Sequence, residues 1–208
     1  MDEPPVTSPP RTRLLDLVTV LLLSVTAVLT AWCGFEASKW GGEMSIAFSQ
    51  ASSARVQAAA AESTAQAARQ YDLTIYTEWV LAEADGRDEL VSFIEERFTD
   101  EFRVAFDAWI AEGRQSLGPF AMDEYVPPGT EEAAELHARA DARFDEALAN
   151  NQRGDDYSLL TVLFALVLFF AALSQNQRAT WRRLTFLGLG LVLGLAGVVV
   201  LATFPIKI

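Results

Sequence analysis

The chain has 208 residues, of which 21% are charged and 51% are hydrophobic, and its formal net charge at pH 7 is −12. A chain of this length holds one or two domains. The acidic balance argues against a nucleic-acid partner, which would require a basic face. A single cysteine, Cys33, excludes an intrachain disulfide and leaves the redox compartment open.

Apolar residues gather in three segments, residues 14–34, 157–173 and 184–204. The first contains one charge, Asp16 near its start, and the other two contain none. Each approaches or reaches the roughly 20 residues that cross about 30 Å of hydrocarbon. Three such segments in one small chain disfavour the alternative of buried core helices. We therefore predict an all-α membrane protein with three transmembrane helices.

Arginines beside the apolar segments predict the orientation of the chain. The loop 174–183 carries Arg178, Arg182 and Arg183 and no acid, and short loops rich in arginine stay in the cytoplasm. The tail, residues 1–13, carries two further arginines, so the N-terminus is also predicted inside. A cleaved signal peptide in place of the first span remains an alternative.

Residues 35–156 form the large polar part of the chain. They hold 25 of the 28 acidic residues but only 10 of the 16 basic ones, for a net charge of −15. The orientation above places this segment, and the C-terminal residues 205–208, outside the cytoplasm. We predict an extracytoplasmic helical hairpin or bundle between the first and second spans, with helices at about residues 43–85, 88–112 and 130–155.

Alanines in the first of these helices follow a seven-residue repeat. The residues at alternating steps of four and three are Ala47, Ala51, Ala54, Ala58, Ala61, Ala65 and Ala68, before a break at Asp72. A seam of this period buries against a partner helix, and small residues allow close axes. Alanine is abundant here, with nine among residues 51–70, so chance is the competing explanation.

A second stripe makes the helix 130–155 the predicted partner. The same steps connect Ala140, Phe144, Ala147, Asn151, Gly154, Ser158, Thr161 and Ala165, which lead into the second span. Thr130 is the predicted N-cap, and the acids after it suit the positive end of the helix dipole. We predict two long antiparallel helices that emerge from the bilayer as continuous rods and pack through small residues.

Residues 88–112 predict a third, strongly apolar helix. Its stripe is Leu90, Ile94, Phe98, Phe102, Phe106 and Ile110, and its predicted cover is Tyr71, Ile75, Tyr76, Trp79 and Val80. Residues 113–129 contain too many glycines and prolines for a helix. Phe120, Met122 and Tyr125 are the predicted anchors of this loop.

No residue pattern predicts chemistry. His137 is the only histidine, and a carboxylate-bridged metal site would require Glu-x-x-His, whereas position 134 is alanine. Acidic groups such as Glu95/Glu96 lack the glycine-containing loop of a calcium site and are predicted to be solvated. We predict no catalytic residue, no cofactor, no metal and no enzymatic activity.

Small and polar residues in the spans suggest packing. Gly190, Gly194 and Gly197 form a small-residue face in the third span that suits close helix contact. Hydroxyl residues such as Thr19 and Thr26 either contact other helices or line a pore formed by several copies.

Three stretches, "ERFTDEFRVAFDAWIA", "PFAMDEY" and "NNQRGDDYSLLTVLFALVLFFAALS", resemble uncharacterised bacterial three-pass membrane proteins of about this length. The resemblance spans most of the chain from Trp32. It implies a location in the bacterial cytoplasmic membrane and a helical architecture, but no activity. The first hypothesis is a non-enzymatic, homo-oligomeric membrane protein whose helical module serves assembly, scaffolding or sensing. The alternatives are a cation-conducting pore with an acidic vestibule and an accessory subunit of a larger membrane complex; lipid and other membrane proteins are the expected partners.

Overall fold

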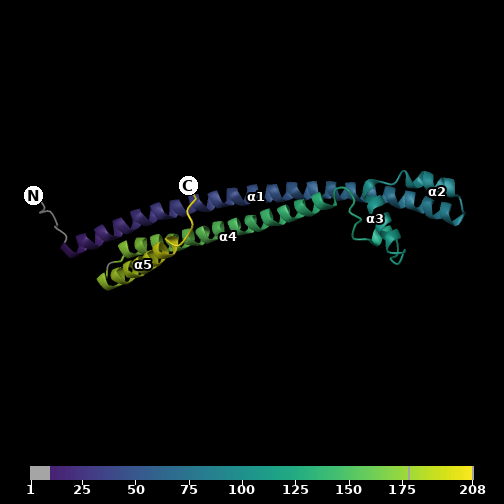
Figure 1. Cartoon of the computed structure of the whole chain (residues 1–208). Helices are drawn as coiled ribbons and strands as arrows, with labels where there is room; N and C mark the ends of the chain where they lie inside the picture. Colours follow the sequence, from purple (N-terminus) through teal and green to yellow (C-terminus); the bar gives the residue numbers. More distant parts are fainter. Residues whose placement is uncertain (1–9, 178, 208) are drawn as a thin grey trace, which may run out of the picture. The chain divides into compact units, whose positions relative to one another are not determined.

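The computed structural model describes residues 10–177 and 179–207, and over these residues it contains helices and no strand. The helices are α1 (Pro10–Ala84), α2 (Asp88–Glu95), α3 (Asp100–Ala111), α4 (Thr130–Gln175) and α5 (Thr180–Leu201), with a 3-10 turn at Pro119–Ala121 (Figure 1). α1, α4 and α5 are each long and apolar enough to cross a bilayer. The predicted all-α class and the three candidate spans are confirmed. Residues 1–9 of the predicted tail and Arg178 lie outside the described residues.

α1 and α4 each join two predicted segments in one helix. α1 passes through Gly34, Gly41 and Gly42 and so unites the predicted span 14–34 with the predicted helix from residue 43. A glycine inside a helix costs about 1 kcal/mol relative to alanine. A long helix tolerates that cost because most of its stability comes from packing of one face.

Two compact units divide the chain. Unit 1 comprises Met1–Ala47 and Glu146–Ile208, and unit 2 comprises Phe48–Asp145. The predicted module of residues 35–156 is therefore divided between the two units. Its first residues pack with the spans in unit 1, where they contact the segment after α5. Each unit is described separately below.

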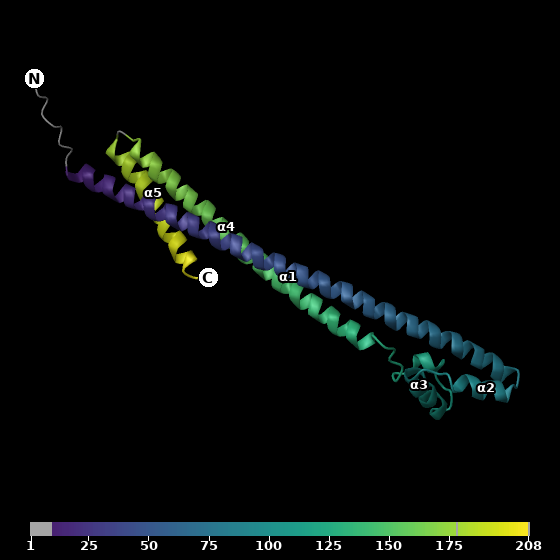
Figure 2. The same ribbon diagram turned by 90° about the horizontal axis from the view of Figure 1, so that it is seen from above.

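In unit 1, α4 runs antiparallel to α1, and α5 runs antiparallel to α4. The Arg153 guanidinium lies 4.7 Å from the centre of the Trp40 ring, and the Phe204 and Tyr157 rings lie 5.3 Å apart. Figures 1 and 2 both show α5, in yellow, beside the second half of α4. The interior of this unit contains Cys33, Leu160, Phe164 and Val167, all buried.

The glycine face of α5 is buried inside unit 1. A Cβ on Gly197 would lie 2.8 Å from Phe164 Cε1, and a Cβ on Gly194 would lie 3.6 Å from Val167 Cγ1. Gly190 faces Leu22 of α1 and the same part of α4. Because these three glycines have no side chain, α5 can approach both neighbouring helices closely.

The predicted stripe on α4 is wrong at three of its positions in unit 1, although Gly154 does pack against Ala37 and Trp40 of α1. Asn151, Ser158 and Ala165 are exposed within the chain, whereas the preceding residues, Asn150, Tyr157 and Phe164, are buried. The physical reason is that α4 in unit 1 packs against two helices. The contact with α5 turns the large apolar residues inward, while a seam between two helices alone would favour the small ones. Tyr157 is consequently in the interior.

Unit 2 has a core of aromatic side chains. Trp79 and Ala82 of α1 pack with Ile94, Phe98, Phe102, Phe106 and Trp109, and Ile75, Tyr76, Phe120, Met122 and Tyr125 surround them. The three predicted loop anchors are confirmed as members of this cluster. Of the predicted cover, Tyr71 and Val80 remain exposed. Edge-to-face contacts are frequent, as between Trp79 and Phe106 at 4.9 Å, and stabilise the cluster beyond its buried area.

The predicted single helix 88–112 is wrong, because α2 and α3 are separated at residues 96–99. Thr99 has an extended backbone and its hydroxyl accepts a hydrogen bond from the Phe102 amide at 3.3 Å, which makes it the N-cap of α3. The break lets Phe98, Phe102 and Phe106 turn toward Trp79 together, whereas a straight helix would spread them along its length.

Candidate functional site at Glu36

Glu36 is a carboxylate buried at a helix contact in unit 1. Its side chain is 0% exposed, and Trp40, one helical turn farther along the same face of α1, is also buried. α1 presents this face to the interior because Cys33, Trp40 and Ala47 lie at the seven-residue spacing of its buried side. Burying a carboxylate is costly unless hydrogen bonds replace its lost water.

The segment after α5 supplies the hydrogen bond that Glu36 receives. The main-chain N–H of Lys207 donates to Glu36 Oε2 at 3.0 Å, and the Tyr157 hydroxyl donates to the Pro205 carbonyl at 3.0 Å. The Lys207 ammonium forms an ion pair with Glu43 at 3.1 Å. Residues 205–207 therefore form polar contacts with both α1 and α4.

Two buried polar atoms of this cluster lack a hydrogen-bond partner among the described residues. They are Glu36 Oε1, an acceptor, and Trp40 Nε1, a donor. The nearby cations do not pair with Glu36. Arg153 and Lys207 instead lie over the Trp40 ring, at 4.7 and 5.3 Å from its centre. The two atoms are thus one acceptor and one donor on adjacent turns of the buried face of α1.

A second polar contact lies at the opposite end of the apolar part of α1. Arg183 donates to Asp16 at 2.5 Å and its side chain is only 14% exposed. Asp16 and Glu36 are separated by 20 residues along α1, which at 1.5 Å per residue is about 30 Å. No charged residue lies between them in α1. This spacing equals the hydrocarbon thickness of a bilayer.

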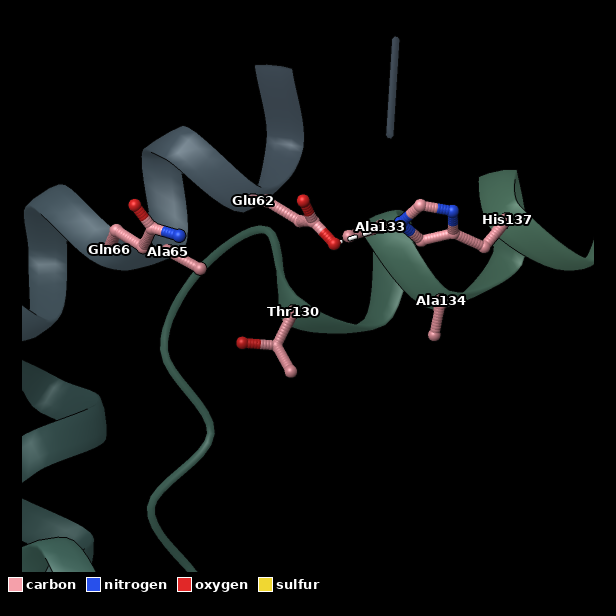
Figure 3. Close-up of a pocket in the computed structure, with 7 residues that line it drawn as sticks. All are labelled: Glu62, Ala65, Gln66, Thr130, Ala133, Ala134 and His137. Carbon is pink, nitrogen blue, oxygen red and sulfur yellow. Dashed lines mark hydrogen bonds and ion pairs between the residues drawn. The ribbon is translucent and has the colours of Figure 1, made fainter. Parts of the chain in front are cut away.

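Unit 2 has a groove of about 430 Å³ between α1 and α4. Figure 3 shows Glu62 and His137 reaching toward each other across it, and Nε2 of His137 lies 2.8 Å from Glu62 Oε1. His137 is half-exposed, and its partner Glu62 was missed in the sequence, although it follows from the antiparallel register of the two helices. Within residues 10–177 and 179–207 no three side chains of His, Cys, Asp or Glu gather as metal ligands would.

Asp72, which interrupts the alanine seam in the sequence, is a buried member of it. Its carboxylate, 2% exposed, accepts hydrogen bonds from the Thr99 hydroxyl at 2.7 Å and from the Tyr125 hydroxyl at 2.9 Å. Burial first, and then the hydrogen bond to Asp72, raise the pKa of Tyr125 above its ordinary value. The carboxylate therefore joins α1 to the start of α3 and to the loop before α4.

The residues of the predicted seam lie as follows. Ala47, Ala51, Ala54, Ala58, Ala61, Ala140 and Ala147 are buried, and Ala65 and Ala68 are half-buried. In unit 2, the contacts Phe48–Phe144, Arg55–Asp141 and Glu62–His137 show that α1 and α4 run antiparallel there.

Other predicted residues are also placed. Arg183 pairs with Asp16, whereas Arg182 is exposed beside Trp181. Thr19 and Thr26 are buried inside unit 1, and the Thr19 hydroxyl donates to the Leu15 carbonyl. These two hydroxyl residues therefore contribute to packing within the chain.

Comparison with known proteins identifies no relative. No family model, no curated protein and no solved structure matches this chain.

Proposed function

We propose that this protein is a non-enzymatic, three-pass protein of the bacterial cytoplasmic membrane whose helical module between the first two spans serves assembly, scaffolding or sensing. In this proposal the N-terminus and the loop 174–183 are cytoplasmic, and the module is extracytoplasmic. The chain forms homo-oligomers or joins other membrane proteins through the module.

One observation carries the proposal: α1 and α4 supply both the apolar spans and the walls of unit 2. α1 contributes Thr19 to unit 1 and Trp79 to the aromatic core of unit 2, with no break in the helix between them. α4 contributes Ala140 to one unit and Phe164 to the other. The same two helices therefore build both the apolar spans and the module, which supports a role of the module in assembly or sensing at the membrane.

The spacing of charges supports the membrane part of the proposal. About 30 Å of α1 between Asp16 and Glu36 is free of charge, and α4 between Tyr157 and Gln175 and α5 after Arg183 are free of charge as well. Large apolar side chains on these segments, including Leu166, Phe169 and Leu195, are exposed within the chain and would face lipid.

Cysteine labelling tests the orientation. Ser63 in unit 2 and Asn176 after α4 are both exposed, whereas the native Cys33 is fully buried, so the wild type serves as the blank. In intact spheroplasts, a membrane-impermeant maleimide should label Ser63→Cys and spare Asn176→Cys until the cells are lysed. Labelling of Asn176→Cys in intact spheroplasts, whether or not Ser63→Cys is also labelled, would overturn the proposed topology.

The mass of the full chain in lipid nanodiscs tests assembly. We expect native mass spectrometry to detect two or more copies per disc at loading ratios where empty discs are in excess over protein. A single copy at every loading ratio, together with no protein that co-purifies from the native membrane, would contradict the assembly role. Ion flux through proteoliposomes above that of empty vesicles would favour the pore instead.

A further inference from the structure

An apolar groove of about 210 Å³ lies between α4 and α5 in unit 1. Five apolar residues and one acid line it: Asp156, Leu159, Leu160, Leu163, Val200 and Phe204. From Asp156 to Leu163 the groove follows seven residues of α4, which is about 10 Å of helix. A groove of this size and lining accommodates part of one hydrocarbon chain.

The carboxylate at the end of the groove has an available oxygen. Asp156 is half-buried, and its Oδ1 accepts a hydrogen bond from Gln152 Nε2 at 2.9 Å. In the described part of the chain no cationic side chain pairs with Asp156. The nearest basic residue in sequence, Arg153, is directed to Asn150 and to the Trp40 ring.

Asp156 also lies at the depth where lipid headgroups would be found. It immediately precedes the charge-free part of α4, which begins at Tyr157. The adjacent Asp155 accepts a hydrogen bond from Asn151 and is exposed. Two carboxylates here repel an anionic headgroup and favour a cationic group that can donate hydrogen bonds.

We propose that this groove binds one phospholipid with a primary ammonium headgroup, such as phosphatidylethanolamine. The ammonium pairs with Asp156, and one acyl chain lies along Leu159, Leu163 and Val200. Phosphatidylcholine offers the same chain and a positive charge but no N–H donor, so it binds more weakly. This inference rests on the proposed membrane location.

The test uses the full-length protein in nanodiscs that contain equal amounts of phosphatidylethanolamine and phosphatidylcholine. Native mass spectrometry after release from the discs counts the lipids that remain bound. We expect the wild type to retain the ethanolamine lipid about two- to fivefold over the choline lipid, the range for one partly exposed ion pair. Asp156→Asn should bring the ratio close to one while leaving total retention largely unchanged.

A second variant tests the groove itself. Val200→Trp fills the groove and should reduce retention of both lipids, whereas Val199→Trp, at an exposed neighbouring position outside the groove, should reduce neither. Equal retention of the two lipids by the wild type, or a preference that survives Asp156→Asn, would overturn the inference. Flotation of the same protein with liposomes separates the outcomes, because a protein that does not float would refute the membrane location instead.

Discussion

Ala58 offers the most direct test of the small-residue contact in unit 2. Its side chain is 0% exposed. The Arg55–Asp141 ion pair and the contact between His137 and Glu62 connect α1 and α4 on either side of it. Leucine at this position adds three carbon atoms to a contact that is already closed. The helices must then separate, or the new side chain must take an unfavourable rotamer.

The expected cost follows from the burial. Overpacking of a well-packed contact destabilises a protein by about 1–3 kcal/mol. In a unit of this size, each 1 kcal/mol lowers Tm by about 4–8 °C. Ala59→Leu is the matched control, because Ala59 is the next residue of the same helix and is exposed. Leucine has nearly the helix propensity of alanine, so the control should change stability by no more than about 0.5 kcal/mol.

The assay is thermal unfolding of the full chain in nanodiscs, followed by tryptophan fluorescence. Trp79 and Trp109 lie in the aromatic core of unit 2 and report on its unfolding. We expect Ala58→Leu to melt at least about 2 °C below Ala59→Leu. Equal melting temperatures for the two variants would refute the reasoning, since they would mean that Ala58 has room for a larger side chain.

Two further substitutions test contacts elsewhere. Gly197→Ala places a methyl group 2.8 Å from Phe164 and should destabilise unit 1 by about 1–3 kcal/mol in a detergent melt. The control is Gly188→Ala, whose methyl group meets nothing within 4 Å and should not destabilise the unit. Equal effects of the two substitutions would argue against the close approach of α5. Tyr125 has a raised pKa in the folded state, so its contribution to stability is fully present below its unfolded pKa of about 10 and is lost as pH rises beyond that value. Tyr125→Phe should therefore remove one late-titrating phenol from the absorbance titration at alkaline pH and flatten the alkaline loss of stability. At neutral pH it should cost about 1–3 kcal/mol, because the buried Asp72 loses a donor, and an unchanged titration curve would contradict this assignment.

Much of the fold could be predicted from local patterns. Hydropathy and length identify the three apolar helices, because a stretch of that length can satisfy its backbone in lipid only as a helix. The seven-residue spacing of alanine identifies the face of α1 that is buried in the structure, as at Ala54 and Ala58. Both the hydropathy and the alanine spacing are local properties of one helix, so they can be read without knowing what that helix contacts.

Other features depended on partners far away in the chain. Glu36 lies only two residues beyond the predicted first span, and its burial depends on Lys207, 171 residues later. Asp16 meets Arg183, which is 167 residues away. The register on α4 shifted for the same reason, since the contact with α5 cannot be read from the pattern of α4 alone.

The sequence by itself determined the helical class, the three apolar segments and the buried face of α1, because these follow from residue type and period along one helix. Only the tertiary structure decided which charged side chains are buried and where the aromatic helix breaks. Asp72 looks like an interruption of the seam until Thr99 and Tyr125 are seen to donate to it. A carboxylate remains in a protein interior when donors from other segments reach it, and their positions are set by the packed fold.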